Sequence, residues 1–111
     1  MFVQVKCDPS LTVGSVVSYS STDSRWNSAS SSSAFIGVLS SAPDSEGWAN
    51  VQFAGISYAL ASRDIPDEGG FCEIENGRVY AVSSGGVGVV APKDKNSATR
   101  VAGDLVMIHV R

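Results

Sequence analysis

Charge is scarce in this sequence. Lys, Arg, Asp and Glu together make up 17% of the 111 residues, against about 25% in an average soluble domain, and the formal net charge is −3. The basic residues are scattered, so the sequence lacks the electrostatic footprint of a nucleic-acid-binding protein. The same scarcity argues against binding to an anionic membrane surface, and no apolar run approaches the roughly 20 residues of a transmembrane helix. We therefore expect neither nucleic acid nor a membrane as a partner.

Histidine and cysteine, which supply most transition-metal sites, are also scarce. The chain has one histidine, His109, and two cysteines, Cys7 and Cys72, which lie far apart and fit no metal-ligand spacing. We expect both cysteines to be small, buried, reduced thiols. No motif places a serine or cysteine beside His109, so a catalytic triad is not predicted. The expectation is a protein with no metal, no cofactor, no catalytic residues and no enzymatic activity.

A signal peptide is another missing feature. The N-terminal stretch MFVQVKC has no basic segment followed by an apolar one. We therefore expect the chain to be made and kept in a reducing cytosol.

Alternation of apolar and polar residues is the main positive signal. It recurs over residues 2–7, 13–19, 49–53 and 56–60, and such a period of two predicts strands. A short helix over residues 54–63 is an alternative, but the segment has no helix cap and no apolar face at helical spacing. The whole pattern predicts a single all-β domain over residues 1–111. We expect a small β-barrel or β-sandwich of seven to nine short, mostly antiparallel strands.

The sequence FCEIENGRVYAV, at residues 71–82, is the strongest local signal. Asn76 and Gly77 can both adopt positive φ, as a two-residue type I′ hairpin turn requires. That turn sets a register in which Glu75 faces Arg78, and we expect an ion pair between them.

The last segment, LVMIHVR, is apolar on both faces. Val106, Ile108 and Val110 share one face, whereas Leu105 and Met107 lie on the other. A strand with two apolar faces is typical of the middle of a fold. We expect its apolar excess to be buried centrally in the domain or against a neighbouring molecule.

Two short segments share one pattern. IGVL at residues 36–39 and VGVV at residues 87–90 both read apolar–Gly–Val–apolar, and each precedes a loop with Ala-Pro and then Asp. The match is too short to establish a duplication. We expect both strands to need glycine at this position because another backbone passes close to each.

Large aromatic residues are the candidate functional residues. Trp26, Trp48 and Tyr58 could form a subunit interface or a platform on which a sugar ring stacks. A small core needs large residues, so core or interface is favoured over a ligand platform. Trp26 follows a polar turn at residues 20–24, and we expect it to begin a strand and anchor one end of the core. The serines at residues 30–33 are then a solvated connection.

Several motifs together resemble the small β-barrel structural proteins of tailed-phage particles, a group that includes capsid decoration (cement) proteins and modules of tail fibres and baseplates. The first motifs are VGSVV at 13–17, a tryptophan three residues before an alanine at 26–29, and IGV at 36–38. The later ones are VQFAGI at 51–56, PDEGGFCEIENGRV at 66–79, and GDLVMIHV at 103–110. The likeness spans nearly the whole chain.

The resemblance implies a non-enzymatic virion protein, assembled in the host cytoplasm. Its first implication is a capsid decoration or cement protein that stabilises the head through contacts with the major capsid protein or another virion protein. It also implies a homo-oligomer, with a trimer favoured. The alternatives are a tail-fibre or baseplate module, or a carbohydrate-binding adhesive module that uses surface aromatics.

Overall fold

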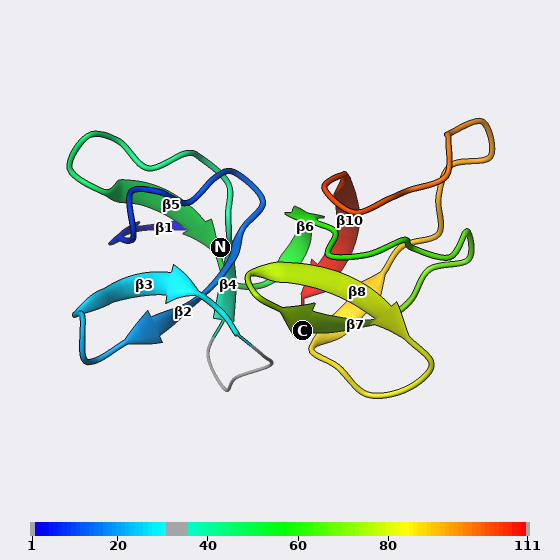
Figure 1. The fold of residues 1–111 in the computed structure, drawn as a ribbon, viewed down its shortest axis with the longest axis horizontal. Coiled ribbons are helices and arrows are strands. Elements are labelled where there is room, and N and C mark those ends of the chain that lie inside the picture. Colours follow the sequence, from blue (N-terminus) through cyan, green and yellow to red (C-terminus); the bar gives the residue numbers. More distant parts are fainter. Residues whose placement is uncertain (1, 31–35, 111) are drawn as a thin grey trace.

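The computed structural model describes residues 2–30 and 36–110, and all their regular structure is β-strand (Figure 1). The described part contains ten strands, more than the seven to nine predicted, and no helix long and apolar enough to cross a membrane. The strands are β1 (Phe2–Lys6), β2 (Val16–Ser20), β3 (Arg25–Ser28), β4 (Ile36–Leu39), β5 (Trp48–Gln52), β6 (Gly55–Leu60), β7 (Gly70–Glu75), β8 (Arg78–Val82), β9 (Gly88–Val90) and β10 (Leu105–Val110).

The strands form two five-stranded antiparallel sheets that lie beside each other in Figure 1. The first sheet has the order β1-β5-β4-β2-β3, and the second has the order β6-β10-β9-β7-β8. The outer strands of each sheet approach each other at one isolated parallel bridge, Cys7 to Trp26 in the first and Ala61 to Val79 in the second. Neither sheet is a closed barrel, so of the two predicted architectures the structure is the sandwich-like one.

The two sheets are built to the same plan. If β1 to β5 are matched in turn with β6 to β10, the two strand orders become identical. The residue pairing matches as well: Leu39 pairs with Val51 in the first sheet, and the corresponding Val90 pairs with Ile108 in the second. We refer to residues 2–53 as the first half of the molecule and residues 55–110 as the second half.

The repeated apolar–Gly–Val pattern falls on matching strands, β4 and β9. Gly37 of β4 pairs with Val17, and Gly88 of β9 pairs with Cys72, which matches Val17. A Cβ atom at Gly88 would collide with the carbonyl oxygen of His109, so another backbone does pass close there. A Cβ atom at Gly37 would instead collide with the side chain of Val51. Both strands therefore need glycine because of a close approach, but only one of the two approaches is by backbone.

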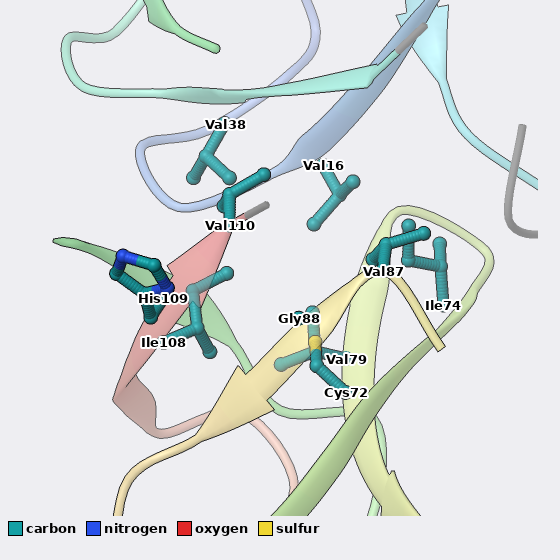
Figure 2. A pocket seen from close by; sticks show the side chains of 10 residues that line it. All are labelled: Val16, Val38, Cys72, Ile74, Val79, Val87, Gly88, Ile108, His109 and Val110. Atoms are coloured by element: carbon teal, nitrogen blue, oxygen red, sulfur yellow. The ribbon is translucent and has the colours of Figure 1, made fainter. Parts of the chain in front are cut away.

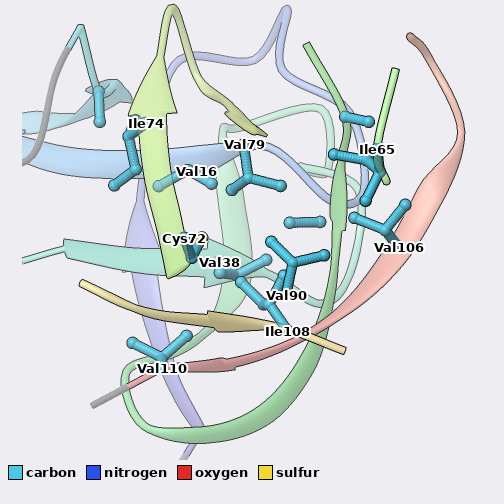
Figure 3. Packing of buried hydrophobic residues seen from close by; sticks show 13 residues of the cluster. Val16, Val38, Ile65, Cys72, Ile74, Val79, Val90, Val106, Ile108 and Val110 are labelled. Carbon is cyan, nitrogen blue, oxygen red and sulfur yellow. The ribbon is translucent and has the colours of Figure 1, made fainter. Parts of the chain in front are cut away.

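Apolar side chains form two cores. The first lies within the first half and contains Cys7, Val17, Trp26, Leu39, Ala49 and Val51. The second is larger and contains Ala59, Ala61, Ile65, Cys72, Ile74, Val79, Val90, Val106, Ile108 and Val110, together with Val16, Ala29 and Val38 of the first half (Figure 3). Because successive side chains of a strand point to opposite faces, Val16 and Val17 serve different cores. The first sheet is thus apolar on both sides of β2, and one of those sides packs on the second half.

The predicted hairpin is confirmed, and its turn joins the two halves. Asn76 and Gly77 have φ values of 50° and 77°, and the register from residue 71 to residue 82 is as predicted. The N–H of Gly77 donates to the carbonyl of Ala29 at 2.6 Å, and the carbonyl of Gly77 accepts from the N–H of Val16 at 2.8 Å. The turn peptide therefore lies between two neighbouring strands of the first sheet.

Two further expectations about this region have different outcomes. The segment that could have been a helix is strand β6, as favoured from the sequence. Glu75 does lie opposite Arg78, but its ion pair is with Arg63, whose guanidinium lies 2.9 Å from the carboxylate and stacks over the Tyr80 ring at 3.8 Å. Arg63 reaches Glu75 because the loop after β6 runs alongside the hairpin. The sequence of residues 71–82 alone could not predict this contact.

Candidate interaction surface

The second sheet has one face turned toward its core and one turned outward. The outward face carries six large apolar side chains, which we call the outer face of the second sheet: Ile56, Tyr58, Phe71, Val89, Leu105 and Met107. Three of them lie in one row across the sheet with His109, since Ile56 pairs with His109, His109 with Val89, and Val89 with Phe71. The face is therefore a continuous apolar surface with one imidazole within it.

These six side chains are open to solvent in the isolated chain. Ile56 is 61% exposed, Tyr58 is 53% exposed and Leu105 is 51% exposed. Large apolar residues gathered on one face in this way mark an interaction site more often than scattered ones do. The strand β10 lies between β6 and β9, as its apolar character predicted, yet its Leu105 and Met107 are not covered by the domain itself. Of the two predicted ways to bury this strand, central burial in the domain is therefore wrong for this face.

Two hollows border the outer face. One, of about 430 Å³, is lined by Phe71, Val89 and their neighbours Glu68, Gly70, Val90, Ala91 and Pro92. The other, of about 350 Å³, lies between β10 and the preceding loop and is lined by Tyr58, Leu105, Val106, Met107, Pro92, Lys93, Asp94, Ser97, Arg100 and Asp104. The first hollow is almost wholly apolar, whereas the second combines an apolar floor with charged walls.

An enclosed gap between the two halves is too small to be a site. Figure 2 shows its lining, which includes Val16 and Val38 from the first half and Ile74, Val79 and Val110 from the second. Its volume is about 10 Å³, at the lower limit of what one water molecule needs, and its walls offer almost no polar partner. It is a packing defect in the contact between the halves.

The aromatic residues singled out from the sequence occupy three different environments. Trp26 is only 9% exposed and lies in the first core, with ring centroids 5.7 Å from Tyr19 and 5.3 Å from Phe53. Trp48 is 39% exposed and lies beneath the ammonium group of Lys6, 5.7 Å from the ring centroid. Of the three candidates, only Tyr58 belongs to the outer face of the second sheet.

The position of Trp26 fits an anchor. It lies in β3, directly after the turn at residues 20–24, and its ring fills the first core. Part of the predicted serine connection, residues 31–33, lies outside the described residues.

Both thiols have a raised pKa because they are buried. Burial raises the pKa of Cys72 to about 12, and burial also raises the pKa of Cys7. Both are free and buried, as predicted. Among residues 2–30 and 36–110, no three His, Cys, Asp or Glu side chains gather in a way that could hold a metal ion. The two thiols belong to the cores, and the outer face of the second sheet remains the best candidate site.

Comparisons with known proteins bear on the fold. No family model matches the sequence, and no curated protein matches it. Among solved structures, the chain is similar to the N base of the head fibre protein gp8.5 of bacteriophage phi29. The two share 12% sequence identity and superpose with a TM-score of 0.64, over 100% of this chain and 93% of the other. At that identity the similarity establishes a shared fold.

Proposed function

We propose that this protein is a non-enzymatic structural component of a tailed-phage virion, attached to the head through protein–protein contacts. The observation that carries the proposal is the fold, which matches the base of a phage head fibre over the full length of the chain. The match also covers 93% of that base, so the likeness extends over nearly the whole of an attachment module. Within this proposal, the finer role is a capsid decoration protein that binds the major capsid protein as a homo-oligomer, with a trimer favoured.

The surface chemistry suits such a role. The outer face of the second sheet offers apolar area, and burying apolar area is the main driving force of protein association. Elsewhere the surface is rich in serine and poor in charge. Short side chains lose little conformational entropy when an interface orders them, so attachment through such a surface costs less.

The proposal is tested on particles. Virions purified from the source culture are analysed by mass spectrometry for this chain, and the purified protein is then sedimented separately with isolated heads and isolated tails. We expect the chain in virions and saturable co-sedimentation with heads. Binding to tails alone would replace the decoration role with a tail module, and absence from virions would overturn the proposal.

Carbohydrate binding is a second candidate because of the hollow beside Tyr58. Its lining combines the exposed ring of Tyr58 with the charged residues Lys93, Asp94 and Asp104. Host glycans are titrated while Tyr58 resonances are followed by NMR, with Tyr58→Ala as the matched variant. Saturable shifts that vanish in Tyr58→Ala would support this function, and no shift with any glycan would remove it.

A further inference from the structure

We infer that the outer face of the second sheet binds a second copy of this chain, and that the surface it binds is the end of the first half around Tyr19. In this contact, the second half of one molecule packs on the first half of the next. The contact resembles the one that the two halves already make inside each molecule. It specifies an interface for the homo-oligomer of the proposed function, and its test on the purified protein is separate from the test on virions.

The first step is the equivalence of two rows of residues. In the first sheet, Val16 pairs with Val38. In the second sheet, the matching residues Phe71 and Val89 pair in the same way. The two pairs therefore occupy the same place on the same face of two sheets built to one plan.

The second step is that one row is covered and the other is not. Val16 is 1% exposed and Val38 is fully buried, because the second half packs on them. The matching Phe71 and Val89 are 41% and 43% exposed. The molecule thus already uses this face of the first sheet as a packing surface and leaves the same face of the second sheet open.

The third step identifies the surface that would cover it. Val16 and Val38 pack in one cluster with Ile74, Val79 and Val110 of the second half. The Ile74–Val79 pair matches Tyr19–Trp26 in the first half, which is a cross-strand pair at the same register. Val110 in turn matches Phe53. The surface in the first half that corresponds to the covering surface is therefore the aromatic cluster of Tyr19, Trp26 and Phe53.

This aromatic cluster has an open side. Ile74 is 3% exposed, in a core that the second half shares with Val16, Ala29 and Val38 of the first, but the matching Tyr19 is 53% exposed. The molecule therefore has two exposed apolar surfaces, the outer face on the second half and Tyr19 on the first half. They correspond to the two sides of a contact that the molecule already makes.

The next row of the outer face is apolar in the second sheet, although the matching row of the first sheet is polar. In the first sheet, the cross-strand pair Gln4–Asn50 is exposed and polar. The matching pair in the second sheet is Tyr58–Met107, which is also exposed but apolar. Two exposed pairs at matching positions thus differ in chemistry, and the apolar pair lies next to the open row.

The outer face has enough apolar area for one side of a stable contact. Aromatic side chains have about 150–250 Å² of surface, so Tyr58 and Phe71, which are 53% and 41% exposed, leave on the order of 200 Å² uncovered. With the four aliphatic side chains the face offers roughly 500 Å², at the upper end of what monomers expose. A standard interface buries about 800 Å² on each partner, of which somewhat over half is apolar. The outer face alone therefore supplies the apolar part of such an interface.

The two surfaces lie on different halves, so each contact joins two different surfaces. A head-to-tail contact gives a closed ring if the rotation between copies closes, and a filament if it does not. It cannot give a symmetric pair in which the same surface meets itself. This property separates the inference from simple pairing of two outer faces.

The test uses two variants that each block one surface. Val89→Lys places a charge in the outer face, and Tyr19→Lys places one in the aromatic cluster. Val101→Lys is the matched control, because Val101 is 46% exposed, like Val89, but lies in the turn before β10. Circular dichroism and thermal melting establish that each variant is folded. Native mass is measured by sedimentation velocity across a dilution series.

We expect the wild type and Val101→Lys to form the same assembly. Each blocking variant alone should be monomeric, with self-association weakened roughly 30-fold or more, as for loss of an interface hot spot. An equal mixture of Val89→Lys and Tyr19→Lys should form a one-to-one dimer and nothing larger, because only one intact pair of surfaces remains.

Three results would overturn the inference. The first is a wild-type protein that is monomeric at every concentration. The second is assembly that Val89→Lys abolishes but Tyr19→Lys leaves intact, which would indicate outer face against outer face. The third is a mixture of the two variants that stays monomeric. If Val89→Lys does not fold, Ile56→Ser replaces it, since Ile56 is 61% exposed on the edge strand β6.

Discussion

Replacing Trp26 by alanine should remove a large share of the stability of the fold. The indole is 9% exposed and contacts Tyr19 edge-on and Phe53 at a tilted angle. An aromatic side chain buries about 150–250 Å², worth roughly 4–6 kcal/mol at about 25 cal/mol per Å². That figure is an upper limit because the unfolded chain is partly compact, and measured Trp→Ala losses in cores are about 3–5 kcal/mol. We therefore expect Trp26→Ala to lose about 3–5 kcal/mol.

The loss is large compared with the total. A domain of this size has about 5–15 kcal/mol of stability in all. A loss of about 4 kcal/mol would lower the melting temperature by about 10–20 °C. Urea unfolding gives the free energy directly, provided that the dependence on urea concentration is unchanged between wild type and variant.

Trp48→Ala is the matched control. Trp48 is 39% exposed, and its main polar contact is the ammonium of Lys6, 5.7 Å from the ring. A cation–π contact at an exposed site is worth about 0.5–1 kcal/mol. We expect this variant to lose about 1–2 kcal/mol, less than half of the loss at Trp26. A Trp26→Ala protein within about 1 kcal/mol of the wild type, or an equal loss at Trp48, would refute the assignment of Trp26 as a core anchor.

Three further predictions concern the second half. Gly85 and Gly86 both have positive φ, 89° and 88°, but only at Gly86 would a Cβ atom collide with the Cys72 carbonyl. Gly85→Ala should cost about 1–2 kcal/mol of unfolding free energy and Gly86→Ala about 1–3 kcal/mol more; equal urea midpoints would contradict this. Because the pKa of Cys72 is raised to about 12, iodoacetamide at pH 8 should alkylate it about a thousandfold more slowly than an unfolded cysteine, as intact mass will show, and equal rates would exclude a buried thiol. The hydrogen bond from Arg63 lowers the pKa of Glu75. The stabilisation from this pair is therefore present above the unfolded pKa of about 4.3 and is lost as the pH falls through the lower folded value. Arg63→Gln should then reduce the acid-induced loss of unfolding free energy, and an unchanged loss would contradict the pairing.

The hairpin shows what local sequence could predict. Asn76 and Gly77 are compatible with one kind of turn, and that turn fixes the register of both strands around it. Every determinant of that prediction lies within residues 71–82. The inward face of β10 was predictable for a similar reason, since the period of two places Val106, Ile108 and Val110 together.

The open face could not be predicted because alternation does not say what covers a strand. Leu105 and Met107 are equally apolar whether a sheet, a second subunit or water lies above them. The outer face combines residues from four strands, and only the pairing of those strands shows that Phe71 and Val89 are neighbours. The one available signal was the apolar character of both faces of residues 105–110.

The shared plan of the two halves was almost hidden in the sequence. Gly37 and Gly88 are 51 positions apart, whereas Val51 and Ile108 are 57 positions apart. The spacing changes because the loop between β9 and β10 is longer than the loop between β4 and β5. No single shift therefore aligns the halves, and matching positions hold different residues, such as Trp26 and Val79.

The turn at Gly77 has a consequence for synthesis on the ribosome. The N–H of Val16 and the carbonyl of Ala29 have Gly77 as their hydrogen-bond partner, and this glycine is made almost 50 residues after Ala29. A nascent first half can pair β2 with β3, but until the hairpin emerges it lacks these two hydrogen bonds and the cover over Val16 and Val38. A ribosome stalled before residue 77 should therefore hold a first half that is more protease-sensitive than in the finished protein, and protection should increase once the hairpin has left the exit tunnel.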